Sequence, residues 1–115
     1  MTPGSADQFS TDYQYIAASQ TNVKITGQKG AGKKGDLIRK LILIPSTVSP
    51  GPVSIKDDTG GSAITVWAGG AGGLVANLEA RPVIVDMTPG ARSVTGPWYI
   101  TTGANVTALV IGRFQ

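Results

Sequence analysis

The segment from Gly27 to Lys34 comes nearer to a chemical motif than any other part of this chain. It reads Gly-Gln-Lys-Gly-Ala-Gly-Lys-Lys, which is one residue short of a phosphate-binding loop. Such a loop ends on a Ser or Thr that binds Mg²⁺, and it leads into a helix whose N-terminus faces the phosphates. Lys34 has no hydroxyl, and Gly35 and Asp36 lead into a β-like run. The segment therefore does not predict nucleotide hydrolysis.

Carboxylates are the next candidates for chemistry. Asp57 and Asp58 are adjacent beside a glycine turn, but neighbouring strand residues point to opposite faces and no ladder of alternating acids follows. The run from Pro82 to Asp86 resembles an apolar strand ending in a metal-binding Asp, yet the chain lacks the crossover helices of a nucleotide-hydrolysing sheet. We expect turn-forming aspartates, no metal site and no cofactor.

The chain contains no His and no Cys. The commonest general base, the thiol nucleophile and the soft metal ligands are therefore missing, and no base-nucleophile pair stands out among the remaining residues. We expect a scaffold or binding protein without enzymatic activity. The enzymatic alternative is a small hydrolase that depends on Asp57, Asp58 and Asp86.

Composition agrees with a single domain that is partly covered by a partner. The 115 residues carry a formal charge of +3, and only 15% of them are charged while 41% are hydrophobic, against roughly 25% charged in an average soluble domain. The first ten residues do not form a secretory signal, and no apolar run approaches the roughly 20 residues that span a bilayer. We expect synthesis in the cytoplasm and no membrane insertion.

Short apolar runs rich in β-branched residues, separated by Gly, Pro, Asn or Asp, predict an all-β domain. Residues 1–12 are polar and predict a flexible N-terminal arm, whereas 13–115 form the β domain. Turns are expected at residues 58–61 and at Thr88-Pro89-Gly90, and a glycine loop at 68–73. The expected strands are 13–18, 22–26, 37–44, 53–57, 63–67, 78–86, 98–102 and 106–114. About eight strands without helices favour an antiparallel β-sandwich with jelly-roll topology.

The last expected strand has two different faces. Val106, Ala108, Val110, Gly112 and Phe114 alternate onto one face, which fits a core. The opposite face is too apolar to be simply solvated, so it either lies beneath a loop or meets a neighbouring subunit. It carries Leu109, Ile111 and Arg113, which we expect to form an oligomer interface.

Two other groups of side chains suggest binding, and each leaves alternatives open. Lys29, Lys33 and Lys34 fit an acidic protein surface or a solvated turn; specific nucleic-acid binding is not expected, because no aromatic residues are interleaved with them. Trp67, Trp98 and Tyr99 are candidates for a glycan-binding platform, or equally for core residues or interface anchors.

Four segments resemble small proteins encoded by tailed bacteriophages. The resemblance lies in Tyr15–Thr21 (YIAASQT), Val53–Asp57 (VSIKD), Gly96–Val106 (GPWYITTGANV) and Gly112–Phe114 (GRF), and it spans nearly all of residues 13–114. It implies a virion component, namely a capsid decoration or cement protein with a β-sandwich fold. The lysine-rich stretch from Lys29 to Lys34 and the Pro97 beside Trp98 depart from the group.

The resemblance also implies partners and a location. We expect a dimer or trimer that binds the major capsid protein on the capsid surface of the virion. The residues expected to contact the capsid are Thr2, Phe9, Asp12, Lys29, Lys33 and Lys34. The alternative is a receptor- or glycan-binding module of a head fibre or tail that uses the aromatic platform.

Overall fold

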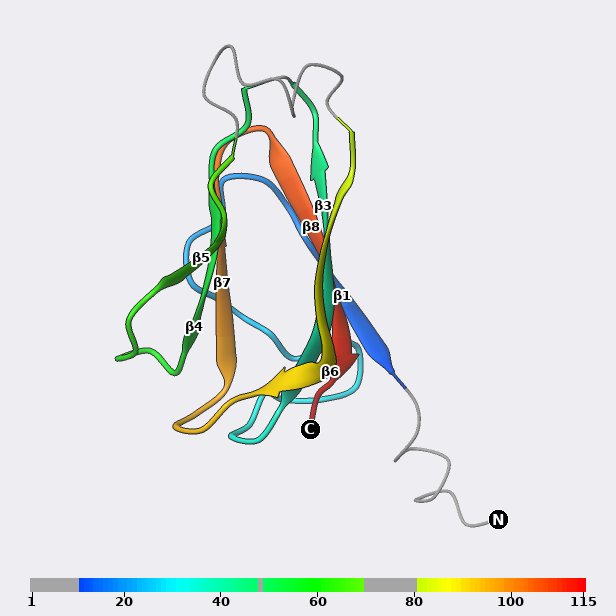
Figure 1. Ribbon diagram of the computed structural model, residues 1–115. Coiled ribbons are helices and arrows are strands. Elements are labelled where there is room, and N and C mark those ends of the chain that lie inside the picture. The colour runs from blue at the N-terminus through cyan, green and yellow to red at the C-terminus, as the bar shows by residue number, and fades with distance from the viewer. Residues whose placement is uncertain (1–10, 48, 70–80) are drawn as a thin grey trace.

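A computed structural model of the chain describes residues 11–47, 49–69 and 81–115, and these form an all-β structure (Figure 1). The expected capsid contacts Thr2 and Phe9, and part of the expected glycine loop, lie outside the described residues. The strands are β1 (Asp12–Ile16), β2 (Val23–Lys24), β3 (Leu37–Pro45), β4 (Val53–Asp57), β5 (Ile64–Trp67), β6 (Val83–Arg92), β7 (Trp98–Thr102) and β8 (Val106–Arg113).

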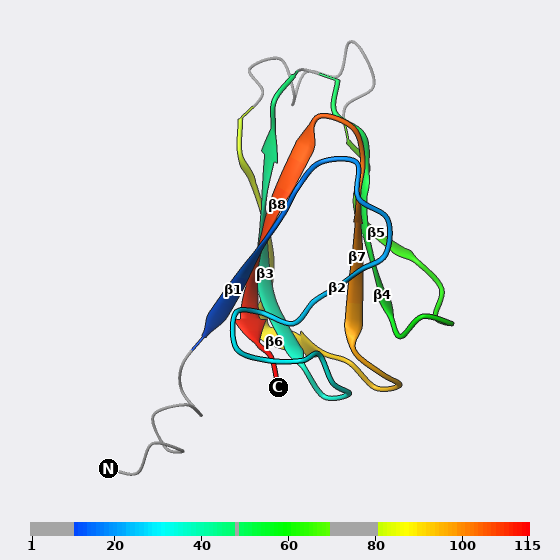
Figure 2. The same ribbon diagram turned by 180° about the vertical axis from the view of Figure 1, so that it is seen from behind.

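The strands form two four-stranded antiparallel sheets packed face to face, as Figures 1 and 2 show from opposite sides. Sheet A has the order β1-β8-β3-β6 and sheet B the order β2-β7-β4-β5. Apart from the β4–β5 hairpin, every connection between consecutive strands crosses from one sheet to the other. This is the strand order of an eight-stranded jelly roll, so the expected fold class is confirmed.

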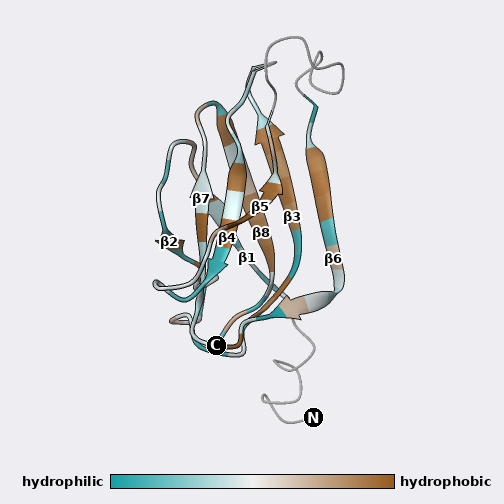
Figure 3. Cartoon of the chain, turned by 60° about the vertical axis from the view of Figure 1, so that its left-hand side comes forward, coloured by the Kyte–Doolittle hydropathy of each residue, from teal (hydrophilic) through white to brown (hydrophobic). Residues whose placement is uncertain are grey.

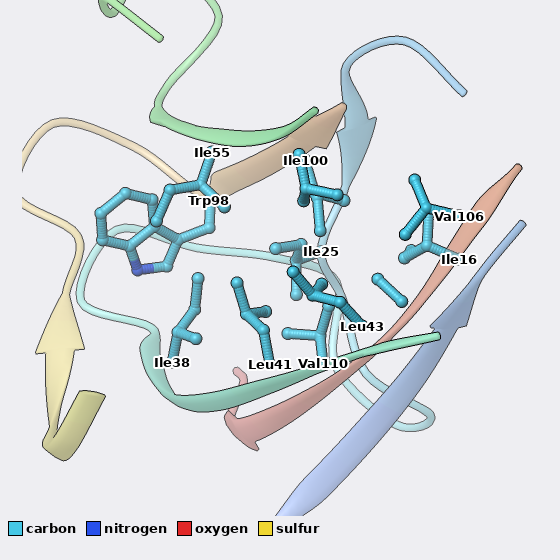
Figure 4. Packing of buried hydrophobic residues seen from close by; sticks show 12 residues of the cluster. Ile16, Ile25, Ile38, Leu41, Leu43, Ile55, Trp98, Ile100, Val106 and Val110 are labelled. Atoms are coloured by element: carbon cyan, nitrogen blue, oxygen red, sulfur yellow. The ribbon is translucent and has the colours of Figure 1, made fainter. Parts of the chain in front are cut away.

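The core lies between the two sheets (Figure 4). It is built by alternate residues of each strand, because successive side chains point to opposite faces. In β8, Val106, Ala108 and Val110 are fully buried, as the alternation in the sequence predicted. The buried hydrophobic residues are Ile16, Ile25, Ile38, Leu41, Leu43, Val53, Ile55, Trp98, Ile100, Val106, Ala108 and Val110.

The turn expected at Thr88-Pro89-Gly90 is wrong, because β6 runs through these residues to Arg92. Ile38 of β3 pairs with Ala91, whereas Lys40 pairs with Asp86, so residues 87–90 stand opposite Arg39 alone. This is a bulge in an edge strand, where Pro is tolerated because the hydrogen-bond ladder is interrupted. The turn-forming dipeptide therefore bends β6 without ending it.

Candidate functional site

Residues 27–34, which we call the lysine-rich loop, lie against the backbone of Gln115. The N–H groups of Ala31 and Gly32 each donate to the backbone oxygen of Gln115 over 2.9 Å. A Cβ atom at Gly30 would lie 2.6 Å from the backbone oxygen of Thr26 and 2.9 Å from that of Phe114. Gly30 thus permits the backbone of the loop to approach the backbone of Thr26 and Phe114 closely. The N–H groups of Ala31 and Gly32 already bind Gln115, so they are not available to bind a phosphate.

The carboxylates of two aspartates accept backbone N–H groups of this loop and hold its backbone in place. Oδ2 of Asp12, in β1, accepts the N–H of Gln28 at 2.8 Å and that of Lys29 at 3.3 Å. Asp36 is fully buried; its Oδ2 accepts the N–H of Lys33 at 2.8 Å, and its Oδ1 accepts that of Gln115 at 2.8 Å. Hydrogen bonds to ionised carboxylates are among the stronger ones. Asp12, expected to lie in the flexible arm, is instead the first residue of β1, where it is half-buried and holds the loop.

Exposed cations gather at the end of the sandwich where this loop lies. Leu37, the first residue of β3, pairs with Arg113 of β8 on one side and with Arg92 of β6 on the other. No ion pair joins the exposed cations here to another residue in the described ranges. We call this set the basic end, and it consists of Lys29, Lys33, Lys34, Arg92 and Arg113. Sequence reasoning missed Arg92 and assigned Arg113 to an oligomer interface, because the register that joins them to the loop links distant segments.

The outer face of sheet A carries a row of apolar side chains. Tyr15 pairs with Leu109, Leu109 with Ile42, and Ile42 with Ile84, so the row crosses all four strands. Tyr15 is 59% exposed and Ile84 is 63% exposed. Tyr13 and Ile44 are exposed on the same face, and Ile111 is half-buried there. In Figure 3 the first part of β6 and the end of β3 are coloured as hydrophobic. The sequence pointed only to Leu109 and Ile111.

The outer face of sheet B is different in kind. Ser54 of β4 pairs with Thr101 of β7 and with Thr65 of β5, and Lys56 pairs with Tyr99. These side chains are polar or carry a polar group, which is ordinary for a solvated sheet face. Of the two outer faces, that of sheet A therefore carries the row of exposed apolar side chains, whereas the exposed Ile64 of edge strand β5 pairs with the buried Ile55.

The three aromatic residues considered for a glycan platform do not lie together. Trp98 is 6% exposed and lies in the core, where Nε1 donates to the backbone oxygens of Asp36 and Ala91. Tyr99, the next residue of the strand, is on the outer face of sheet B, and Trp67 packs against the core from the edge strand β5. The glycan-binding alternative therefore lacks the platform on which it was based.

Asp57 anchors the distant segment 94–96 and not the hairpin that follows it. Its carboxylate accepts the N–H groups of Val94 at 2.7 Å, Thr95 at 3.1 Å and Gly96 at 3.1 Å. Burial raises the pKa of Asp57, but these three hydrogen bonds outweigh it and the pKa lies below its usual value. Asp58 follows with a positive φ of 69° and caps Thr59 in the hairpin.

Asp86 lies on the outer face of sheet A. Its carboxylate accepts the hydroxyl and the N–H of Thr88, and it pairs across the strands with Lys40. The side-chain hydrogen bond from Thr88, its N–H and the charge of Lys40 lower the pKa of Asp86. Within residues 11–47, 49–69 and 81–115, no group of three or more His, Cys, Asp or Glu is placed to hold a metal. In the same ranges no helix has the length and apolarity to cross a membrane.

Comparison of the chain with protein-family models, with curated proteins and with solved structures finds no match. A jelly roll serves many unrelated functions, so the fold alone does not define one. The surfaces that have features of a binding site are the basic end and the outer face of sheet A.

Proposed function

We propose that this chain is a non-enzymatic structural protein of a bacteriophage virion that decorates the capsid and stabilises it by bridging neighbouring subunits. Support comes from the resemblance of Tyr15–Thr21, Val53–Asp57 and Gly96–Val106 to small proteins of tailed phages. The major capsid protein is the proposed partner, and the capsid surface is the proposed location.

The observation that carries the proposal is the basic end. Its lysines are exposed, while the backbone that bears them is held by Asp12, Asp36 and Gln115. A preorganised loop loses less conformational entropy on binding than a mobile one. Cations without intramolecular partners favour an acidic surface and speed the encounter with it. A rigid cluster of cations on a small charge-poor domain fits a protein that docks onto an acidic shell.

Decoration requires no chemistry from the chain. A protein that binds the assembled shell and not its separate subunits stabilises the shell by its binding free energy. Repetition over a symmetric lattice makes modest individual contacts sufficient when one particle bridges several sites. The absence of His and Cys from the sequence is compatible with this role.

The experiment is binding to capsids that lack this protein. We expect the purified chain to sediment with such capsids, to raise their melting temperature, and to bind less tightly as salt increases. Lys33→Glu combined with Lys34→Glu should abolish binding. The matched control is Lys56→Glu combined with Ser62→Glu and Thr65→Glu, which makes the same total charge change on and beside strands β4 and β5 of sheet B. Failure of the unmodified chain to bind, or equal loss in both variants, contradicts the proposal.

A further inference from the structure

The outer face of sheet A has the properties of a protein contact and not of a solvated surface. The row Tyr15–Leu109–Ile42–Ile84 is continuous across four hydrogen-bonded strands. Ile44 adds to it at 41% exposure. Contiguous exposed apolar patches beyond a few hundred Å² are uncommon on monomeric proteins and mark interaction sites. The polar outer face of sheet B shows that the fold does not require such a surface.

Charges on this face identify the occupant. Lys40 and Asp86 are cross-strand partners in the row next to Ile42 and Ile84. A partner surface of one sign would place a like charge against one of these two side chains. A second copy of the same face, turned about a two-fold axis, offers an acid where the first offers a base. The pair is therefore self-complementary, and so are the two isoleucines beside it.

We propose that the outer face of sheet A is the contact between two copies of this chain, related by a two-fold axis that runs along the strands between β3 and β6. This axis places Lys40 of each copy opposite Asp86 of the other, and Ile42 opposite Ile84. Contacts of this kind are isologous and close after two subunits. Packed sheets stand about 10 Å apart, which lets these side chains meet.

With this axis the overlap consists of β3 and β6, and β8 borders it, because β6 is the edge strand of sheet A. Leu109 lies in the apolar row beside Ile42, and Ile111 lies beside Lys40 in the next row. Both residues thus adjoin the proposed contact. Arg113 lies further along β8, next to Leu37 at the basic end, and stays free for another partner. The dimer does not depend on capsid binding, so the two proposals can fail separately.

The first test is the oligomeric state of the full chain in solution, measured by sedimentation over a wide range of concentration. We expect a dimer, and we expect Ile84→Lys to weaken it by about a hundredfold or more. Ile84 is 63% exposed, so the variant should fold normally. The control is Thr65→Lys, an equivalent change at an exposed position of sheet B. A monomeric chain, or a dimer that Ile84→Lys leaves intact, overturns the proposal.

A charge exchange tests the pairing itself. Lys40→Glu alone and Asp86→Lys alone each place like charges opposite one another across the axis, and each should be monomeric. In an equimolar mixture of the two variants, residue 40 of each copy again meets an opposite charge at residue 86 of the other copy, so we expect heterodimers. A substitution that damaged the fold of its own copy would do so equally in the mixture, so heterodimers in the mixture report the pairing across the axis. A mixture that stays monomeric overturns the proposed axis. If the chain is monomeric and Ile84→Lys abolishes capsid binding, the face belongs to the capsid contact instead.

Discussion

The indole N–H of Trp98, in sheet B, donates to the backbone oxygen of Asp36, which immediately precedes β3 of sheet A, over 3.0 Å. The same N–H also lies 3.1 Å from the backbone oxygen of Ala91 in β6. One donor from β7 therefore ties sheet B to β6 and to the residue that precedes β3 in the opposite sheet. This hydrogen bond lies beside the lysine-rich loop, because Asp36 follows Lys34 by two residues.

Replacing this donor should be costly. We expect Trp98→Phe to lower the free energy of unfolding by about 2–3 kcal/mol, because two carbonyl groups lose their donor and the smaller ring leaves space in the core. Urea unfolding measures the change. Trp67→Phe is the control, since Trp67 is only half-buried on edge strand β5. An equal loss in both variants would contradict the role of the shared hydrogen bond.

Asp57 should make stability depend on pH. Its pKa in the folded protein lies below its usual value. The stabilisation is therefore complete above the unfolded pKa of about 3.9 and is lost as the pH falls through the lower folded pKa. Thermal unfolding between neutral and strongly acidic pH should show this loss. Asp57→Asn should melt at a lower temperature near neutral pH and lack this part of the acid dependence.

Asp58→Asn is the matched control for this prediction. The Asp58 carboxylate caps only the adjacent Thr59 N–H, and Asn tolerates the positive φ of this position. The control should therefore keep the acid dependence of the unmodified chain. A pH profile of Asp57→Asn that parallels that of the unmodified chain would show that the three backbone hydrogen bonds do not lower the folded pKa.

Gly112 should not tolerate a side chain. A Cβ atom there would collide with the backbone oxygen of Leu37, because β8 and β3 approach closely at this irregular point of the ladder. We expect Gly112→Ala to destabilise the fold by about 2–3 kcal/mol through strain in the two central strands of sheet A. In Gly60→Ala the new methyl group has no atom within 4 Å, and stability should change little. Thermal unfolding of both variants provides the comparison.

A substitution of Asp36 tests whether capsid binding depends on the fixed backbone of the lysine-rich loop or on its positive charge alone. Asp36→Asn keeps the size of the side chain but replaces one acceptor with a donor, so either the Lys33 or the Gln115 hydrogen bond is lost. We expect faster hydrogen exchange of the Ala31 and Gly32 amides and weaker capsid binding, although the variant is more positive. Binding that is unchanged or tighter would mean that charge alone is sufficient.

The strands and their faces could be predicted because alternation is a local signal. Val53 and Ile55 in β4, and Val106 to Val110 in β8, point inward as their spacing indicates. The bulge of β6 could not be predicted, because it exists only in relation to Arg39 on the partner strand. The basic end and the apolar row likewise depend on register. That register joins Leu37 to Arg113 and Tyr15 to Leu109, and no pattern within a single segment encodes it.

The position of β8 between β1 and β3 determines when this protein can fold during its synthesis. Among the described strands β1 pairs with β8 alone, so Tyr13 and Tyr15 emerge from the ribosome long before the residues that complete their sheet. β3 can pair earlier with β6 but still lacks its second neighbour. Pairing between such distant segments closes large loops and is slow. Sheet A can therefore be completed only after residues 106–113 have left the ribosome, and until then β1 and one edge of β3 lack their partner strand.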